Sequence, residues 1–193
     1  MRYGPCYCDI KLDNEGIEIL NRALENSDLT LIDSVLGDQK HSDVSKNIRS
    51  SKNAWIKDSE FCQFFNQICS DVNRMSGWNL DINGGDYVQY GVYDVGDYYG
   101  WHADQLDHIQ EFDKIKCIRK ISVTLMLSGP DEYEGGELDL ELYKPDEDKR
   151  IESFKPEKYE AIFFQSDVWH RVRPVKSGIR KSLVTWFYGP PYV

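Results

Sequence analysis

Two histidines and one aspartate have the types and the spacing of a metal site. His102 and Asp104 lie two positions apart, just past a strand pattern, and side chains two apart on an extended chain point the same way. His170 follows Val168-Trp169 within another strand-like segment and can supply a third ligand. Two imidazoles and one carboxylate form the facial set that binds non-haem Fe(II) and leaves coordination positions open. The same ligands also suit a catalytic Zn²⁺, so they do not by themselves fix the metal.

A carboxylate-binding pair follows the third candidate ligand. Arg180 comes ten residues after His170, and Ser182 comes two residues later on the next expected strand. A guanidinium binds a carboxylate through two parallel hydrogen bonds, and a hydroxyl adds one more. A metal beside such a clamp fits a keto-diacid such as 2-oxoglutarate. A zinc hydrolase has no need of this clamp, so Arg180 favours iron.

The elements that must position these residues are mainly strands. Before residue 84 the pattern predicts helices, one after Asp13 as N-cap and one over Asp58–Met75 that ends near Gly77. After Gly84 short strands and turn signals alternate, which is typical of a sandwich or barrel. Strands are expected over residues 87–90, 120–127, 137–143, 161–164, 168–172 and 182–188, a turn at 95–97 and a turn-rich loop at 130–136.

Composition bounds the alternatives. The 193 residues suit one domain, with residues 1–83 as a helical and strand support region and 84–193 as the β core. The net charge of −10 makes a nucleic-acid partner unlikely, because binding phosphates requires basic surface. Five cysteines, an odd number, with no signal-like N-terminus favour a reducing cytoplasm, and no apolar run is long enough to span a membrane.

Several blocks of sequence together resemble the prolyl 4-hydroxylase-like oxygenases, and they occur in that family's order. They cover roughly Tyr87 to Tyr188, about half of the chain. A shorter upstream segment, Arg49-Ser50-Ser51 with Trp55, is similar to the family's Arg-x-Ser segment. The blocks are Tyr93–Asp104, Arg119–Ser128, Tyr133–Leu138, Ala161–His170 and Val175–Leu183.

The resemblance implies a double-stranded β-helix, or jelly roll, with supporting helices. It implies Fe(II) on His102, Asp104 and His170, with 2-oxoglutarate and O₂ as co-substrates and ascorbate as a supporting reductant. By the same resemblance Arg180 anchors 2-oxoglutarate and the Tyr93 hydroxyl also reaches it. Ser182 occupies a position that varies in the family, so its part in the clamp is less fixed than that of Arg180.

The resemblance suggests hydroxylation of a peptidyl proline in a peptide or protein. Arg49 and Trp55 are then candidates for a segment over the substrate. Trp101 and Trp169, which flank the histidine ligands where the family has Phe or Tyr, are candidates for the pocket wall. Oxidation of a small metabolite or free amino acid is the alternative reaction. A jelly-roll binding module without turnover is the alternative class, and the intact ligand set argues against it.

Overall fold

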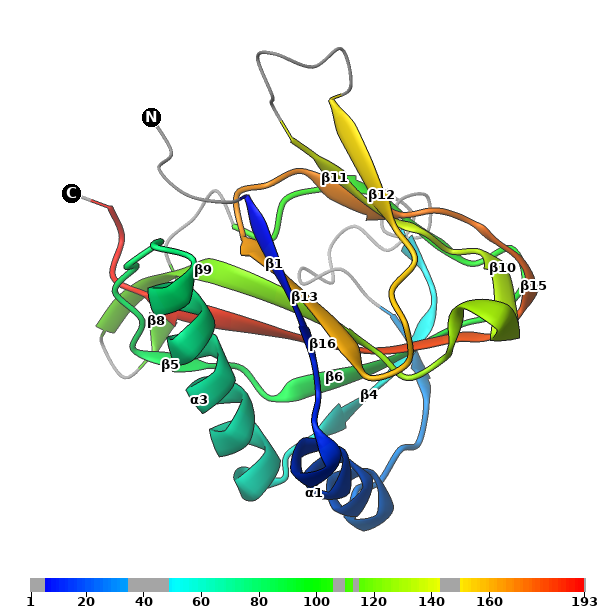
Figure 1. Ribbon diagram of the computed structural model, residues 1–193, viewed down its shortest axis with the longest axis horizontal. Helices are drawn as coiled ribbons and strands as arrows, with labels where there is room; N and C mark the ends of the chain where they lie inside the picture. Colours follow the sequence, from blue (N-terminus) through cyan, green and yellow to red (C-terminus); the bar gives the residue numbers. More distant parts are fainter. Residues whose placement is uncertain (1–5, 35–48, 106–109, 113–114, 143–149, 193) are drawn as a thin grey trace.

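Two antiparallel β-sheets face each other, and two helices cover the outer side of the larger sheet (Figure 1). The computed structural model describes residues 6–34, 49–105, 110–112, 115–142 and 150–192. The predicted class, mainly β with flanking helices, is confirmed by this arrangement. The two strands that carry His102 and His170 lie side by side in the smaller sheet.

The larger, or major, sheet has the strand order β1-β13-β9-β16-β6-β4-β2. β5 also pairs with β16, and β8 pairs with β9. The longest strand pairing joins β16 to β9 along most of their length, so these two strands form the centre of the sheet. The strands are β1 (Tyr7–Lys11), β2 (Ile32–Asp33), β4 (Lys52–Ile56), β5 (Gly84–Gly85), β6 (Val88–Tyr93), β8 (Gln110–Phe112), β9 (Ile115–Met126), β13 (Glu160–Gln165) and β16 (Arg180–Gly189).

The smaller, or minor, sheet has the order β12-β11-β14-β7-β3, and a separate pair joins β10 to β15. β14 pairs with β7 so that His170 lies directly opposite His102. The chain passes from β3 in the minor sheet to β4 in the major sheet through one residue, Ser51. The strands are β3 (Arg49–Ser50), β7 (Tyr98–His102), β10 (Tyr133–Gly135), β11 (Leu138–Glu141), β12 (Ile151–Phe154), β14 (His170–Val172) and β15 (Val175–Gly178).

Both predicted helices form, and Asp13 caps the first as predicted. Helix α1 (Asn14–Asn26) is capped by Asp13, which accepts a hydrogen bond from the Gly16 amide at 2.8 Å. Helix α3 (Ser59–Met75) is capped by Asp58, which accepts from the Phe61 amide at 2.8 Å. Each cap satisfies an amide that has no partner inside its helix.

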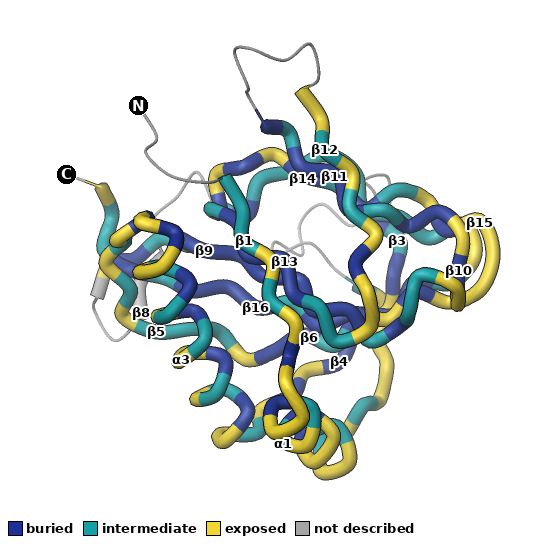
Figure 2. Tube along the Cα trace, in the orientation of Figure 1, coloured by how far each residue is buried: buried dark blue, intermediate teal, exposed yellow. Residues whose placement is uncertain are grey.

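The main hydrophobic core lies between the helices and the major sheet (Figure 2). Helix residues such as Leu20 and Phe61 pack against strand residues such as Ile56, Val88 and Leu183. Because side chains alternate along a strand, the residues between these point to the opposite, inner face. A second cluster, which includes Leu138 and Phe164, fills part of the space between the two sheets. The remainder of that space holds the site.

Several strands were not expected from the sequence. β1, β3, β12 and β15 lie in segments where no strand was expected, and the expected loop at 130–136 contains β10, paired with β15. Gly135 and Gly136 have φ of 70° and 64°, as expected for a turn that needs positive φ. Among the described residues, no helix has both the length and the apolar content needed to cross a membrane.

Candidate active site

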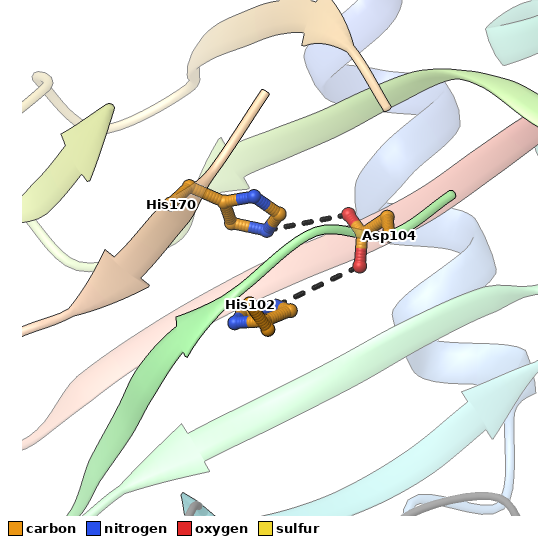
Figure 3. A group of neighbouring side chains, drawn as sticks. All are labelled: His102, Asp104 and His170. Atoms are coloured by element: carbon orange, nitrogen blue, oxygen red, sulfur yellow. Dashed lines mark ion pairs between the residues drawn. The ribbon is translucent and has the colours of Figure 1, made fainter. Parts of the chain in front are cut away.

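The structure brings His102, Asp104 and His170 together between the sheets (Figure 3). The Nε2 atoms of His102 and His170 lie 3.6 Å and 3.3 Å from the two carboxylate oxygens of Asp104. Metal–nitrogen and metal–oxygen bonds of about 2 Å place neighbouring ligand atoms roughly 3 Å apart. The three side chains therefore have the separation of ligands on one face of a metal ion.

Backbone carbonyls orient both imidazoles toward the aspartate. His102 Nδ1 lies 2.8 Å from the Gly100 carbonyl oxygen, and His170 Nδ1 lies 2.9 Å from that of Val168. A proton on each Nδ1 makes these hydrogen bonds and leaves the Nε2 lone pairs free for a metal. The donor set and its outer contacts thus fit a divalent ion such as Fe(II).

Burial keeps the ligands in the forms that bind metal. Burial and the nearby His170 lower the pKa of His102 to about 4, so its ring is neutral at neutral pH. Burial raises the pKa of Asp104, but His170 and His102 outweigh this effect, and the net pKa lies below its ordinary value. A neutral imidazole and an ionised carboxylate are the states that coordinate a metal.

Arg180 lines the same cavity and is 1% exposed. It donates to the Ser182 hydroxyl at 2.9 Å, and its guanidinium lies 5.2 Å from the centre of the Tyr93 ring. Its buried Nε has no hydrogen-bond partner, and no carboxylate among the described residues is within ion-pair distance. A buried charge without a partner is costly, so this geometry favours an anionic ligand. The three residues of the expected clamp lie together.

Tyr99 and Arg49 pack in a stack against one face of the His102 ring. The Tyr99 ring lies parallel to the His102 ring, with 3.6 Å between the ring centres. The Arg49 guanidinium covers the other face of Tyr99 at 4.8 Å from its centre. Arg49 is fixed in turn by hydrogen bonds of 2.9 Å to Ser51 Oγ and to Gln89 Oε1. Arg49 is therefore part of the cavity wall, and Tyr99 is a contact that the sequence did not single out.

Trp186 forms a further part of the cavity wall and was also missed from the sequence. Its buried indole Nε1 has no hydrogen-bond partner. The Arg119 guanidinium stacks on this indole at 4.0 Å and pairs with Asp86 at 3.2 Å, while its buried Nε also lacks a partner. The unsatisfied indole donor in the cavity wall favours a ligand with an acceptor there. A tryptophan six residues after Arg180, on the same face of the strand, was the available signal.

The other three tryptophans named as substrate contacts are not in the cavity wall. Trp101 stacks with Arg171, whose guanidinium lies 4.8 Å from its ring. Trp169 is 52% exposed, and Trp55 is 38% exposed on β4. Strand alternation explains the first case, because Trp101 neighbours His102 and so points to the opposite face of the minor sheet. The pocket-wall role expected of Trp101 and Trp169 is not supported.

Comparison with known proteins places these residues in a family. The sequence model of the 2OG-Fe(II) oxygenase superfamily matches residues 88–188. A PKHD-type hydroxylase of Synechococcus sp. (strain CC9902) is 37% identical over 93 residues, which are 48% of this chain and 37% of that protein. A PKHD-type hydroxylase of Colwellia psychrerythraea is 37% identical over 87 residues, 45% of this chain and 37% of that protein. The match thus spans little more than a third of these relatives.

Solved structures share the fold over nearly the whole chain. A prolyl-4-hydroxylase from Pseudomonas putida is 21% identical, with a TM-score of 0.65 over 94% of this chain and 91% of that one. A viral collagen prolyl hydroxylase from Paramecium Bursaria Chlorella virus-1, in its 2OG complex, is 21% identical, with a TM-score of 0.66 over 96% and 97%. These likenesses confirm the jelly-roll fold, and the family match covers the segment that carries all three candidate ligands and Arg180. The chain belongs to the 2OG-Fe(II) oxygenase superfamily.

Proposed function

We propose that this protein is an Fe(II)- and 2-oxoglutarate-dependent dioxygenase that hydroxylates a C–H bond. The substrate that we propose is a peptidyl proline. One observation carries the proposal. A three-ligand metal site and a buried guanidinium with no carboxylate partner among the described residues line the same cavity. The first requires a divalent cation and the second an anion, and a chelating keto-diacid satisfies both.

In this proposal the chain's own residues bind and orient. His102, Asp104 and His170 hold the metal on one face, and Arg180, with Ser182 and Tyr93 beside it, holds the far carboxylate of 2-oxoglutarate. When bound, Fe(II) and 2-oxoglutarate supply the oxidation: O₂ is consumed, 2-oxoglutarate becomes succinate and CO₂, and one oxygen atom enters the substrate C–H bond. The two sheets keep water away from the reacting atoms, because their inner faces are largely buried.

The substrate class rests on the relatives and on the cavity wall. Relatives in sequence are named PKHD-type hydroxylases, and a structural neighbour is named a prolyl-4-hydroxylase. In this chain the free indole donor of Trp186 suits a carbonyl oxygen, which a peptide presents at every residue. A small metabolite or free amino acid remains the second candidate, since a carboxylate would satisfy the same donor.

Anaerobic titration tests the cofactors. Adding Fe(II) and 2-oxoglutarate without O₂ should produce the weak visible charge-transfer band of the chelate, and His102→Ala should abolish it. Succinate release in air should depend on both additions, with ascorbate prolonging it. If no band formed with Fe(II) and Zn²⁺ supported hydrolysis instead, the protein would be a zinc hydrolase. If the band formed without turnover on any substrate, a binding module would be the better description.

Mass spectrometry tests the substrate. Proline-containing peptides and free amino acids are incubated with the complete system, and a gain of one oxygen is sought in each. The proposal expects the gain on a prolyl residue within a peptide. A gain only on free amino acids or other small molecules would leave the oxygenase assignment in place and refute the assignment of a peptide as substrate.

The compartment is a separate proposal. All five cysteines, Cys6, Cys8, Cys62, Cys69 and Cys117, are free thiols in the structure. Burial raises the pKa of Cys69 well above its ordinary range, which keeps that thiol protonated and unreactive. This state supports a reducing compartment such as the cytoplasm. Fractionation of the source cells, with thiol labelling of the recovered protein, tests it.

A further inference from the structure

Beside the cavity, the inner face of the major sheet carries two exposed aromatic rings and a lysine that the catalytic proposal does not use. We call Trp55, Lys57 and Tyr87 the aromatic ledge. Tyr87 is 55% exposed and Trp55 is 38% exposed. Exposed aromatic rings that gather on one face commonly mark a binding surface.

Strand register places the ledge on the same face as the cavity. Trp55 on β4 lies opposite Gln89 on β6, and Gln89 lines the cavity. Directly paired residues of an antiparallel sheet project to the same face, so Trp55 faces inward. Continuing the pairing by two residues puts Lys57 opposite Tyr87, and the Lys57 ammonium indeed lies 5.6 Å from the Tyr87 ring centre.

Asp86 connects the ledge to Trp186. Val184 on β16 lies opposite Gln89, but Phe187 lies opposite Gly85, so the register shifts by one residue and Trp186 faces Asp86, the chain neighbour of Tyr87. The Asp86 amide donates to the Trp186 carbonyl at 2.8 Å, which confirms that the strands stay adjacent there. β16, β6 and β4 lie side by side in Figure 1. The ledge therefore begins one residue along the chain from Asp86, which pairs with Trp186 of the cavity wall, and it runs over Tyr87 and Lys57 to Trp55.

Beyond Trp55 the surface continues into an open groove. Its other wall is the polar segment that follows α1, and the groove is lined by Asn26, Ser27, Asp28, Trp55, Lys57 and Asp58. Among the described side chains, none with a carboxylate pairs with the Lys57 ammonium. The rings of Trp55 and Tyr87 beside the Lys57 ammonium match an extended peptide. Such a peptide presents side-chain surface to the rings and carbonyl oxygens to the donor.

We propose that the aromatic ledge binds the part of a peptide substrate that flanks the hydroxylated residue. The proposal rests on the proposed function and adds a subsite to it. Neighbouring strands are about 4.8 Å apart, so β4 lies roughly 10 Å from β16. An extended peptide advances about 3.1–3.3 Å per residue, so the ledge contacts residues roughly two to four positions from the one beside Trp186. The substrate is therefore read beyond its target residue, on one side only.

Peptide length is the experimental variable. Two capped probes, Ala-Pro-Ala and a ten-residue Ala-Pro repeat, are titrated anaerobically into the protein loaded with Mn(II) and 2-oxoglutarate, and affinity is measured by calorimetry. The long probe should bind at least about tenfold more tightly, since the ledge adds contacts that the short probe cannot reach. Extending the short probe on one end alone should recover the gain, and extending the other end should not.

Variants assign the gain to the ledge. Tyr87→Ala and Trp55→Ala should each weaken the long probe about fivefold to tenfold and leave the short probe unchanged. Trp169→Ala is the matched control, because that ring is similarly exposed but lies on the minor sheet segment away from the ledge. Equal affinity of the two probes, no binding of either, or equal loss for both in the variants would each overturn the inference. The visible Fe(II)–2-oxoglutarate band, recorded on the same preparations, separates this failure from failure of the proposed function.

Discussion

Replacing Arg180 by methionine should raise the stability of the ligand-free protein or leave it unchanged, while abolishing 2-oxoglutarate binding. The side chain is 1% exposed, its Nε has no partner, and no carboxylate of the described residues pairs with it. Methionine fills a similar volume without a charge. An ordinary core substitution lowers both stability and ligand affinity. A substitution that keeps or raises stability but removes ligand affinity therefore identifies a side chain whose role is to bind the ligand.

The magnitudes follow from the two environments of the guanidinium. Removing a buried charge in favour of an apolar side chain stabilises by about 1–4 kcal/mol, and losing the Ser182 hydrogen bond costs about 1 kcal/mol. With 2-oxoglutarate bound, the same substitution leaves the ligand's carboxylate buried and unpaired, which costs about 3–5 kcal/mol. At 1.4 kcal/mol per tenfold, that weakens binding by roughly a hundredfold to a few thousandfold.

Thermal unfolding with Mn(II) in place of iron measures both effects. At a hundred times its Kd, 2-oxoglutarate stabilises wild type by about 2.7 kcal/mol, or roughly 5–11 °C for a chain of this size. The variant should show no such shift at the same concentration, and its ligand-free midpoint should equal or exceed that of wild type. Arg180→Lys keeps the charge but cannot donate two parallel hydrogen bonds to a carboxylate, so its 2-oxoglutarate shift should lie between those of wild type and Arg180→Met. A variant that unfolded many degrees earlier yet still responded to 2-oxoglutarate would refute the assignment of Arg180 as anchor.

Three further outcomes test the surroundings of the metal site. Burial lowers the pKa of His102 from its ordinary value near 6.5 to about 4, so the unfolded chain binds a proton at higher pH than the folded chain does. The free energy of unfolding of the metal-free protein should therefore fall by roughly 3 kcal/mol as the pH drops from 6.5 to 4, and urea denaturation measures it. His102→Gln should flatten that dependence, and a slope of the opposite sign would contradict it. Tyr99→Leu should weaken Co(II) binding about threefold to tenfold in calorimetry by removing the ring beneath His102, whereas Tyr99→Phe should not. Gly178→Ala should cost at least about 2 kcal/mol in chemical denaturation, because its φ is 72° and an added Cβ would lie 2.1 Å from the Glu132 carbonyl oxygen; Gly129→Ala, with open space around it, should be neutral.

Local signals sufficed for the helices and for two of the three candidate metal ligands. Asp13 and Asp58 act within one turn of their own helices, so their capping is readable from neighbouring residues. His102 and Asp104 are two residues apart, so strand alternation alone puts them on one side. The arrival of His170 opposite His102 depends on pairing of distant strands, and it was inferred from ligand chemistry and family resemblance.

Features that depend on register were only partly readable from the sequence. Trp186, Tyr99 and Trp101 are all strand aromatics, and which of them faces the cavity is decided by a one-residue difference in position. The glycines at 135–136 predict a turn, whereas the structure forms β10 there, with its backbone paired to β15. The division into a support region before residue 84 and a core after it stays a prediction, and β3 and β4 show that the first segment adds strands to both sheets.

The passage from β3 to β4 through Ser51 constrains how this barrel can change during evolution. Arg49 pairs with Tyr99 in one sheet, and Lys52 pairs with Val92 in the other. Because only Ser51 joins these two pairings, the register of one fixes the register of the other. Inserting a single residue there would turn every later β4 side chain over and carry Trp55 to the helix side. This corner therefore tolerates no change of length.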